Sequence, residues 1–259
     1  MDFVSIQGVQ LEVQRIPGAP GRSTLVFLHD GLGSVSLWTQ LGKSWPQAVC
    51  LATGRGGLVY SRRGYGHSDP VADARGNGRL DANYLHREAW EVLPQLLAAE
   101  GLNRPVLVGH SDGASIALLH ASQHPVSAVI AMAPHVLVED IAIKAIAEAA
   151  TLYQGGDLRQ RLSRHHADVD GAFWRWNDVW LSQAFLSFDI RKECAQITAP
   201  LLLVQGTGDE YGTMRQLDEI ALAAPHAHQL RLAACAHSPH RDQPEKITQR
   251  IADFLQNVP

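Results

Sequence analysis

The strongest constraint on the fold of this chain is a repeated alternation of short, continuous apolar runs with longer stretches whose apolar residues recur every three or four positions. The apolar runs occupy residues 9–16, 24–28, 58–61, 106–109, 126–132, 201–206 and 229–232, and the helical spacing occupies residues 83–100, 113–123, 213–223 and 244–256. Strands that are apolar throughout are typical of a parallel sheet covered by helices on both faces. The pattern therefore predicts an α/β fold with a short antiparallel start.

One long interval interrupts this alternation. From Pro134 to about Ile197 no strand pattern occurs, and the sequence indicates several helices joined by glycine-containing loops. The interval is too long for a single crossover between neighbouring strands. We therefore expect an α/β core formed by residues 1–134 and 198–259, with a helical cap or lid inserted at residues 135–197.

The composition limits the classes of partner. The chain has 22 lysines and arginines against 26 aspartates and glutamates, so it offers no large positive field for binding nucleic acid. No stretch reaches the length of about 18 uncharged apolar residues that a membrane span requires, and the N-terminus lacks the basic and apolar regions of a secretory signal. We expect a cytoplasmic protein that acts on a small molecule and binds neither nucleic acid nor membrane, while the sequence gives no indication of its oligomeric state.

Cysteines and histidines give no sign of a metal site. The three cysteines, Cys50, Cys194 and Cys235, are far apart and odd in number, so each is expected to be a small buried apolar residue. The closely spaced histidines His165 and His166, His226 and His228, and His237 and His240 do not lie four residues apart on one predicted helix. No phosphate-binding or dinucleotide-binding glycine motif occurs where such a motif would have meaning. We expect neither a metal nor a cofactor.

The motif that most clearly indicates chemistry is G-x-S-x-G, formed by Gly109, Ser111 and Gly113 between an apolar strand and a helix. In this setting the turn is so tight that the serine takes strained backbone angles. Side chains at the two flanking positions would collide with the neighbouring strand and helix, which explains glycine at both. The turn raises the hydroxyl at the C-terminal end of the strand, where the first N–H groups of the helix can stabilise an alkoxide. Ser111 is therefore the candidate nucleophile.

A serine that attacks a carbonyl near neutral pH needs a basic histidine and an acid that fixes the histidine tautomer. In the chain order serine, acid, histidine, Asp209 directly follows a late strand, and His237 and His240 follow the next one. Either histidine could face the site. Glu139 and Asp140, after the preceding strand, are rival acids.

Several motifs together carry a family resemblance. The segments LHDGLGS, SRRGYGHSDP, VGHSDGASIALLHA, QGTGDEYG and AHSPHRDQPE occur in this order. With them the chain resembles proteins of the α/β-hydrolase-fold superfamily over nearly its whole length, and within it bacterial serine hydrolases with a helical cap. The resemblance implies a mostly parallel eight-stranded sheet flanked by helices and a carboxylesterase-like enzyme. Because this fold supports many reactions, it does not fix the function.

The resemblance also implies roles for individual residues. The segment AHSPHRDQPE is similar to the G-H-x-x-x-x-E ending of the superfamily, with Ala236 in place of the usual glycine, so His237 is the implied base. Asp209 is then the acid that orients it. Serine hydrolases of this type need both to activate the nucleophile.

The second oxyanion donor is implied by the segment LHDGLGS, which resembles the His-Gly-Gly-Pro-Gly loop of many serine hydrolases. The backbone N–H groups of Gly31 and Asp112 are the expected pair of donors. An ionised Asp112 side chain would oppose the negative oxygen unless it were paired, and Asp30 raises the same concern from the other side. Arg62 and Arg63 are the nearest candidates for an ion pair with Asp112 at the rim of the site.

The insertion is rich in aromatic residues. Trp174, Trp176 and Trp180 are candidates for an apolar substrate pocket, although packing of the cap on the body explains them as well. Trp176 and Trp180 are one helical turn apart and so share a face. The basic residues of the insertion are expected to form a solvated helix face that gives no reason to infer an anionic substrate; they are Lys144, Arg159, Arg161 and Arg164.

The expected function is that of a serine hydrolase that cleaves a small, mostly apolar ester, thioester or related carbonyl compound through an acyl-enzyme. The resemblance disfavours dehalogenases and epoxide hydrolases, which have aspartate in place of Ser111. It leaves open a carbon–carbon bond hydrolase of ring-fission products, although Ser238 replaces the tryptophan usual there after the catalytic histidine. A cofactor-free oxygenase and a ligand-binding protein without catalysis are further alternatives.

Overall fold

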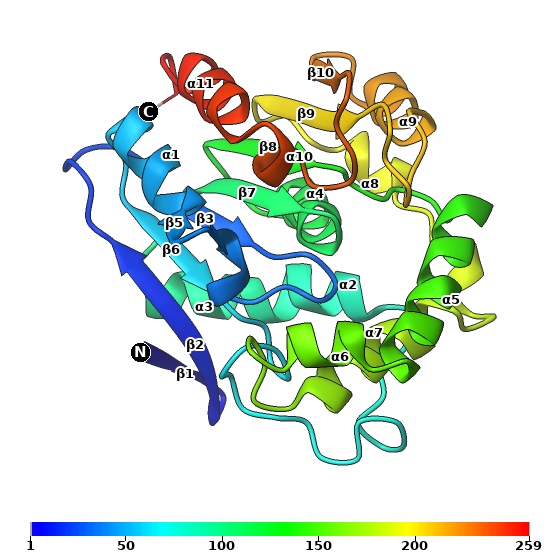
Figure 1. The fold of residues 1–259 in the computed structure, drawn as a ribbon. Helices are drawn as coiled ribbons and strands as arrows, with labels where there is room; N and C mark the ends of the chain where they lie inside the picture. The colour runs from blue at the N-terminus through cyan, green and yellow to red at the C-terminus, as the bar shows by residue number, and fades with distance from the viewer. Residues whose placement is uncertain (1, 259) are drawn as a thin grey trace.

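The computed structural model describes residues 2–258 and is built around a sheet of eight strands in the order β1-β2-β6-β3-β7-β8-β9-β10 (Figure 1). The strands are β1 (Asp2–Ile6), β2 (Val9–Ile16), β3 (Leu25–Leu28), β6 (Gly57–Tyr60), β7 (Val106–His110), β8 (Ala128–Met132), β9 (Leu201–Gly206) and β10 (His228–Leu232). Strand β2 pairs antiparallel with β1 and β6, and all other neighbours are parallel. The predicted α/β fold with a mostly parallel eight-stranded sheet is confirmed.

Helices cover both faces of this sheet. On one face lie α1 (Trp45–Thr53), α10 (Pro239–Asp242) and α11 (Pro244–Phe254). On the other face lie α2 (Tyr84–Arg87), the π-helical turn Glu88–Val92, α3 (Leu93–Ala99), α4 (Asp112–Gln123), α8 (Arg191–Cys194) and α9 (Arg215–Ala223). A small hairpin of β4 (Thr39–Gln40) and β5 (Lys43–Ser44) precedes α1.

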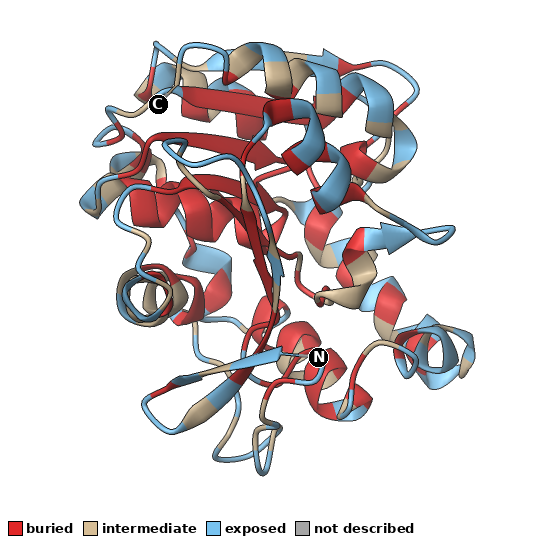
Figure 2. Ribbon diagram, turned by 90° about the vertical axis from the view of Figure 1, so that its left-hand side faces the viewer, coloured by how far each residue is buried: buried red, intermediate tan, exposed pale blue. Residues whose placement is uncertain are grey.

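The two covered faces explain why the central strands are apolar throughout. Successive side chains of a strand point to opposite faces. In β3, Leu25 and Phe27 join the core beneath α1 and α11, whereas Val26 and Leu28 join the core beneath α3 and α4. Figure 2 shows the central strands buried along their length, with exposed residues on the outer sides of the helices.

The segment between β8 and β9 is helical. It contains α5 (Asp140–Gln154), α6 (Asp157–Leu162), α7 (Val169–Trp180), the 3-10 turn Phe185–Ser187 and α8. Asp168 caps α7 by accepting a 2.9 Å hydrogen bond from the N–H of Gly171. Figure 1 shows α5, α6 and α7 standing apart from the sheet at one side of the molecule. The buried Trp180 at the end of α7 fixes this helix to the core by donating its indole N–H to the hydroxyl of Tyr84 at 3.0 Å.

Two further predictions concern burial and membranes. Cys50, Cys194 and Cys235 are all buried and unpaired with each other, as expected for small apolar residues. Within residues 2–258, no helix is both long enough and apolar enough to cross a membrane.

Candidate active site

Ser111 occupies a strained turn between β7 and α4, with φ 54° and ψ −119°. Such angles are costly for a residue with a side chain and persist only where the surroundings enforce them. A Cβ atom at Gly109 would overlap the backbone of Gly113, and one at Gly113 would overlap the carbonyl of Leu28. The collision predicted from the sequence thus explains glycine on both sides of the serine. The N–H of Ser111 is held by the carbonyl of Met132 at 2.9 Å.

His237 and Asp209 meet at the ends of neighbouring strands. The Nδ1 atom of His237 lies 2.8 Å from Oδ1 of Asp209. The same carboxylate accepts backbone N–H groups from Tyr211 at 2.9 Å and Gly212 at 3.2 Å, and its other oxygen accepts the side-chain amide of Gln205 at 3.1 Å. Because the carboxylate is fixed by these donors, it can hold the imidazole in one orientation.

The electrostatics of this pair favour one protonation pattern. Burial alone would lower the pKa of His237, but the hydrogen bond and charge of Asp209 raise it above the ordinary 6.5. Burial would raise the pKa of Asp209, but its bond to His237 and the charge of that ring keep the pKa below its ordinary value. With Asp209 ionised, the proton of the neutral ring stays on Nδ1, and Nε2 is left as the basic nitrogen.

Ser111 and His237 line the same cavity, whose volume is about 640 Å³. Neither the Ser111 hydroxyl nor the His237 Nε2 atom makes a hydrogen bond with any group of residues 2–258. Catalytic hydrogen bonds of this kind often tighten only when substrate is bound. Both reactive atoms are thus available to a molecule in this cavity.

The alternative residues take other positions. Glu139 accepts hydrogen bonds from the N–H and hydroxyl of Thr213, and Asp140 begins α5. His240 lies on α10 and is buried, with its ring centroid 4.9 Å from that of Trp38. Of the candidate acids and bases, Asp209 and His237 are the two that contact each other.

The backbone N–H groups of Gly31 and Asp112 have no acceptor in the part of the chain that the structure describes. Gly31 lines the cavity, and Asp112 is the first residue of α4, directly after Ser111. The N-terminus of a helix carries a partial positive charge. Both amides can therefore donate to a negative oxygen that forms beside Ser111.

The side chain of Asp112 is turned away from the cavity. Its Oδ2 atom accepts the hydroxyl of Tyr84 at 2.7 Å and lies 3.7 Å from the guanidinium of Arg62, while Oδ1 accepts the indole N–H of Trp180 at 3.3 Å. The expected ion pair is present, but it is buried rather than at the rim, and its cation is Arg62, since Arg63 is exposed. Burial raises the pKa of Asp112, and the charge of Arg62 opposes that rise.

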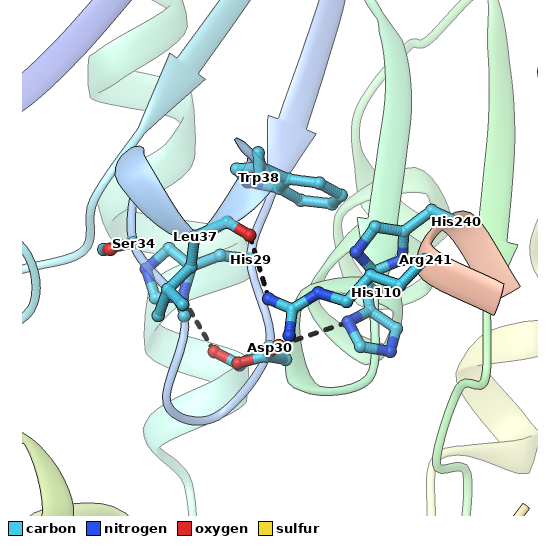
Figure 3. A pocket seen from close by; sticks show the side chains of 9 residues that line it. His29, Asp30, Ser34, Leu37, Trp38, His110, His240 and Arg241 are labelled. Atoms are coloured by element: carbon cyan, nitrogen blue, oxygen red, sulfur yellow. Dashed lines mark hydrogen bonds and ion pairs between the residues drawn. The ribbon is translucent and has the colours of Figure 1, made fainter. Parts of the chain in front are cut away.

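His110 is a residue whose role the sequence did not indicate, although it stands next to the nucleophile. Its Nε2 donates to the carbonyl of His237 at 2.7 Å, and its Nδ1 lies 3.3 Å from Oδ2 of Asp30. Figure 3 shows Asp30, in the loop that follows β3, beside His110. Burial would raise the pKa of Asp30, but the bond and charge of His110 hold it well below its usual range. His110 thus links the loop of Gly31 to the loop of His237.

The three tryptophans of the insertion take different positions. Trp176 lines the cavity, and its ring lies so close to Gly31 that a Cβ atom there would overlap the indole. Trp180 contacts Asp112 instead, and Trp174 packs against the guanidinium of Arg75, 4.2 Å from its ring centroid. Of the three candidates for a substrate pocket, only Trp176 is among the residues that line this cavity, while Trp174 and Trp180 pack against other side chains, as the alternative explanation expected.

The basic residues of the insertion lie in two different environments. Arg159 forms an exposed ion pair with Asp170, as a solvated helix face would. Arg161 and Arg164 are exposed as well, as expected for a solvated face, and they also line the cavity. The remaining lining residues mix apolar and charged groups, namely Asp30, Leu32, Leu37, His110, Leu158, Leu162, His165, Glu210, Tyr211, Ser238 and Arg241.

Comparisons with known proteins agree with this architecture. The sequence model of the alpha/beta hydrolase family matches residues 25–250. The chain is 25% identical to the sn-1-specific diacylglycerol lipase ABHD11 of Mus musculus over 96% of this chain and 86% of that protein. It is 24% identical to a proline iminopeptidase of Heyndrickxia coagulans over 99% of this chain and 98% of that protein.

A solved structure has the same fold. The enol-lactonase from Burkholderia xenovorans LB400 superposes with a TM-score of 0.73, at 20% sequence identity, and the match covers 99% of this chain and 100% of that one. Identity this low carries the fold and not the substrate.

Proposed function

This chain is a hydrolase that belongs to the alpha/beta hydrolase family, and we propose that it is a serine hydrolase that cleaves a small ester, thioester or related carbonyl compound through an acyl-enzyme. The observation that carries the proposal is the 2.8 Å contact between His237 and Asp209 at a cavity that Ser111 also lines. Nucleophile, base and orienting acid are the parts that acyl transfer to serine requires.

In the proposed reaction, Nε2 of His237 accepts the Ser111 proton while the hydroxyl oxygen attacks the substrate carbonyl. Asp209 holds the imidazolium that forms. The N–H groups of Gly31 and Asp112 donate to the oxyanion, each contributing about 3 kcal/mol to stabilisation of the transition state. His237 then passes its proton to the leaving group and activates the water that hydrolyses the acyl-enzyme.

The cavity supports a small substrate. Its volume of about 640 Å³ lies within the range of about 300–1,000 Å³ typical of small-molecule sites. Leu37, Leu158, Leu162 and Trp176 provide apolar surface for an acyl or alcohol chain.

Organophosphate labelling and an ester panel test this proposal. We expect an organophosphate to modify Ser111 stoichiometrically and the protein to hydrolyse short p-nitrophenyl esters. Ser111→Ala should lower turnover about a million-fold, leaving the contributions of binding and the oxyanion hole. Ser115→Ala is a suitable control, because Ser115 is buried on α4 and bonds to His135 rather than lining the cavity.

Three other outcomes would contradict the proposal in different ways. Turnover of dienoic ring-fission products without ester turnover would indicate carbon–carbon bond hydrolysis. Oxygen uptake with an aromatic substrate would indicate a cofactor-free oxygenase. Tight ligand binding without turnover, equal in the native protein and in Ser111→Ala, would indicate a binding protein.

A further inference from the structure

Two cationic side chains of the segment between β8 and β9 face the cavity that Ser111 lines. Arg161 lies on α6, and Arg164 lies in the turn that follows it. Leu158, Leu162 and His165 line the same cavity. Since residues 158, 161 and 162 follow the spacing i, i+3, i+4, one face of α6 is turned toward the cavity.

The charges of these two arginines are not neutralised by the protein. Within residues 2–258, the guanidinium groups of Arg161 and Arg164 form neither an ion pair nor a hydrogen bond with another residue. Arg159, on the same helix but outside the cavity, is paired with Asp170 through two hydrogen bonds of 2.9 and 2.7 Å. The unpaired cations of α6 and its following turn are thus the ones that line the same cavity as the candidate nucleophile.

A third arginine lines the same cavity from another element. Arg241 of α10 lines the cavity, and one of its guanidinium nitrogens donates to the carbonyl of Leu37 at 2.8 Å (Figure 3). After burial, the positive charges of Arg241 and Arg164 are what lower the pKa of His165. The positive charges of Arg164 and Arg241 therefore act on the same side chain of the cavity.

Two acidic residues, Asp30 and Glu210, also line the cavity, but within residues 2–258 neither forms an ion pair with Arg161 or Arg164. Asp30 lies 3.3 Å from His110 and also accepts the N–H of Leu32 at 2.9 Å. Glu210 accepts the backbone N–H of His237 at 3.2 Å. An anion that enters the cavity would meet the guanidinium groups of Arg161 and Arg164, whose N–H groups bind no other residue within residues 2–258.

We propose that the substrate carries an anionic oxygen group, a carboxylate or a phosphate, which Arg161 and Arg164 bind while its ester carbonyl lies at Ser111. Guanidinium groups present paired N–H donors that match the oxygens of such groups. The apolar leucines between the two ends suit a short hydrocarbon chain. This subsite rests on the proposed serine hydrolase function and narrows it to small esters with one charged end.

The direct test compares two esters of the same leaving group, the p-nitrophenyl half-ester of glutarate and p-nitrophenyl pentanoate. We expect the native protein to have a higher kcat/KM for the anionic ester. Arg161→Gln and Arg164→Gln should each lower the ratio of kcat/KM for the anionic ester to that for the neutral ester about tenfold, the value expected for one charged hydrogen bond. Arg159→Gln, a matched loss of charge outside the cavity, should leave this ratio unchanged. Added salt should reduce the preference.

A ratio near one in the native protein, or a ratio equal in all four proteins, would overturn the subsite. Calorimetry with Ser111→Ala separates this failure from failure of the proposed chemistry. Glutarate that binds to Ser111→Ala, and binds more weakly when Arg161→Gln is added, supports the subsite even if no ester is hydrolysed. Hydrolysis of the neutral ester together with no binding of glutarate or inorganic phosphate refutes the subsite alone. Comparing glutarate with phosphate in the same titration identifies which anion fits.

Discussion

The carboxylate of Asp112 lies 3.7 Å from the guanidinium of Arg62, and both groups are buried beneath the turn that presents Ser111. An acid directly after the nucleophile would work against a negative oxygen if its charge faced the site. The ion pair and the bonds from Tyr84 and Trp180 hold that charge away from the residues that line the cavity. The backbone N–H of Asp112 is thereby left to serve as an oxyanion donor.

Substitution of Arg62 should therefore lower the stability of the fold. Arg62→Met leaves the Asp112 carboxylate buried without its cation, and we expect the free energy of unfolding to fall by about 3–5 kcal/mol. Part of this loss comes from the bonds that Arg62 donates to the carbonyls of His29 and Asp30, at 2.9 Å each. Urea unfolding of Arg62→Met, Asp112→Asn and the double variant isolates the pair. If the two single losses simply add, the ion pair contributes nothing and this interpretation is wrong.

The raised pKa of His237 sets the pH dependence of turnover. The ring accepts a proton from Ser111 only when it is neutral, so kcat/KM should rise with pH through an apparent pKa above 6.5. Asp209→Asn removes the main group that raises this pKa, so the profile should shift to lower pH while kcat falls about 10⁴-fold. Glu210→Gln, which removes a weaker charge, should shift the profile less. A profile that stays in place in Asp209→Asn would show that another group controls the rate.

Much of the fold could be predicted from local sequence pattern, because central strands and amphipathic helices bury most of their surface in any packing. The prediction missed α1, although the side chain of Ser44 accepts the N–H of Gln47 as a cap and the buried residues Val49, Cys50 and Thr53 recur at helical spacing. It also missed β1, whose residues are mostly exposed at the sheet edge and so lack a continuous apolar run.

Some residues of the candidate site could likewise be predicted from local sequence, and others could not. Ser111 stands in a local motif, whereas the role of His110 depends on contacts with Asp30 and His237, which are distant in sequence. Helix spacing places Trp176 and Trp180 on one face but does not say how deep each lies. One turn shifts a side chain by about 5.4 Å along the axis, which is enough for one to line the cavity and the other to be buried against Asp112.

The link made by His110 should position the base rather than take part in chemistry. His110→Leu removes the bond to the His237 carbonyl, and a displacement of about 1 Å in the base is expected to lower kcat about a hundred-fold. The rate of organophosphate labelling at Ser111 should fall in parallel, since labelling needs the same base. His110→Gln keeps a donor on the side chain and should recover part of both rates. A purely structural role would lower the melting temperature while leaving the kcat of the folded protein unchanged.

Contact between Gly31 and Trp176 predicts the effect of one added methyl group. In Gly31→Ala the new Cβ would overlap the indole, so the ring or the loop must move and the N–H of residue 31 leaves its position. Loss of one oxyanion donor lowers kcat by about 10²–10³-fold. Gly155→Ala is the matched control, because its φ is −65° and its added Cβ would come no closer than 3.4 Å to a neighbouring atom.

Removing the indole of Trp176 tests whether its contact with residue 31 causes the loss of kcat in Gly31→Ala. A Trp176→Ala background removes the three atoms nearest to the methyl group of Gly31→Ala, so the further loss in kcat on adding it should be much smaller than in the native background. Steady-state kinetics on all four proteins give this comparison directly. Equal losses in both backgrounds would mean that the loop needs glycine for its own backbone, and that the indole does not set the position of the donor.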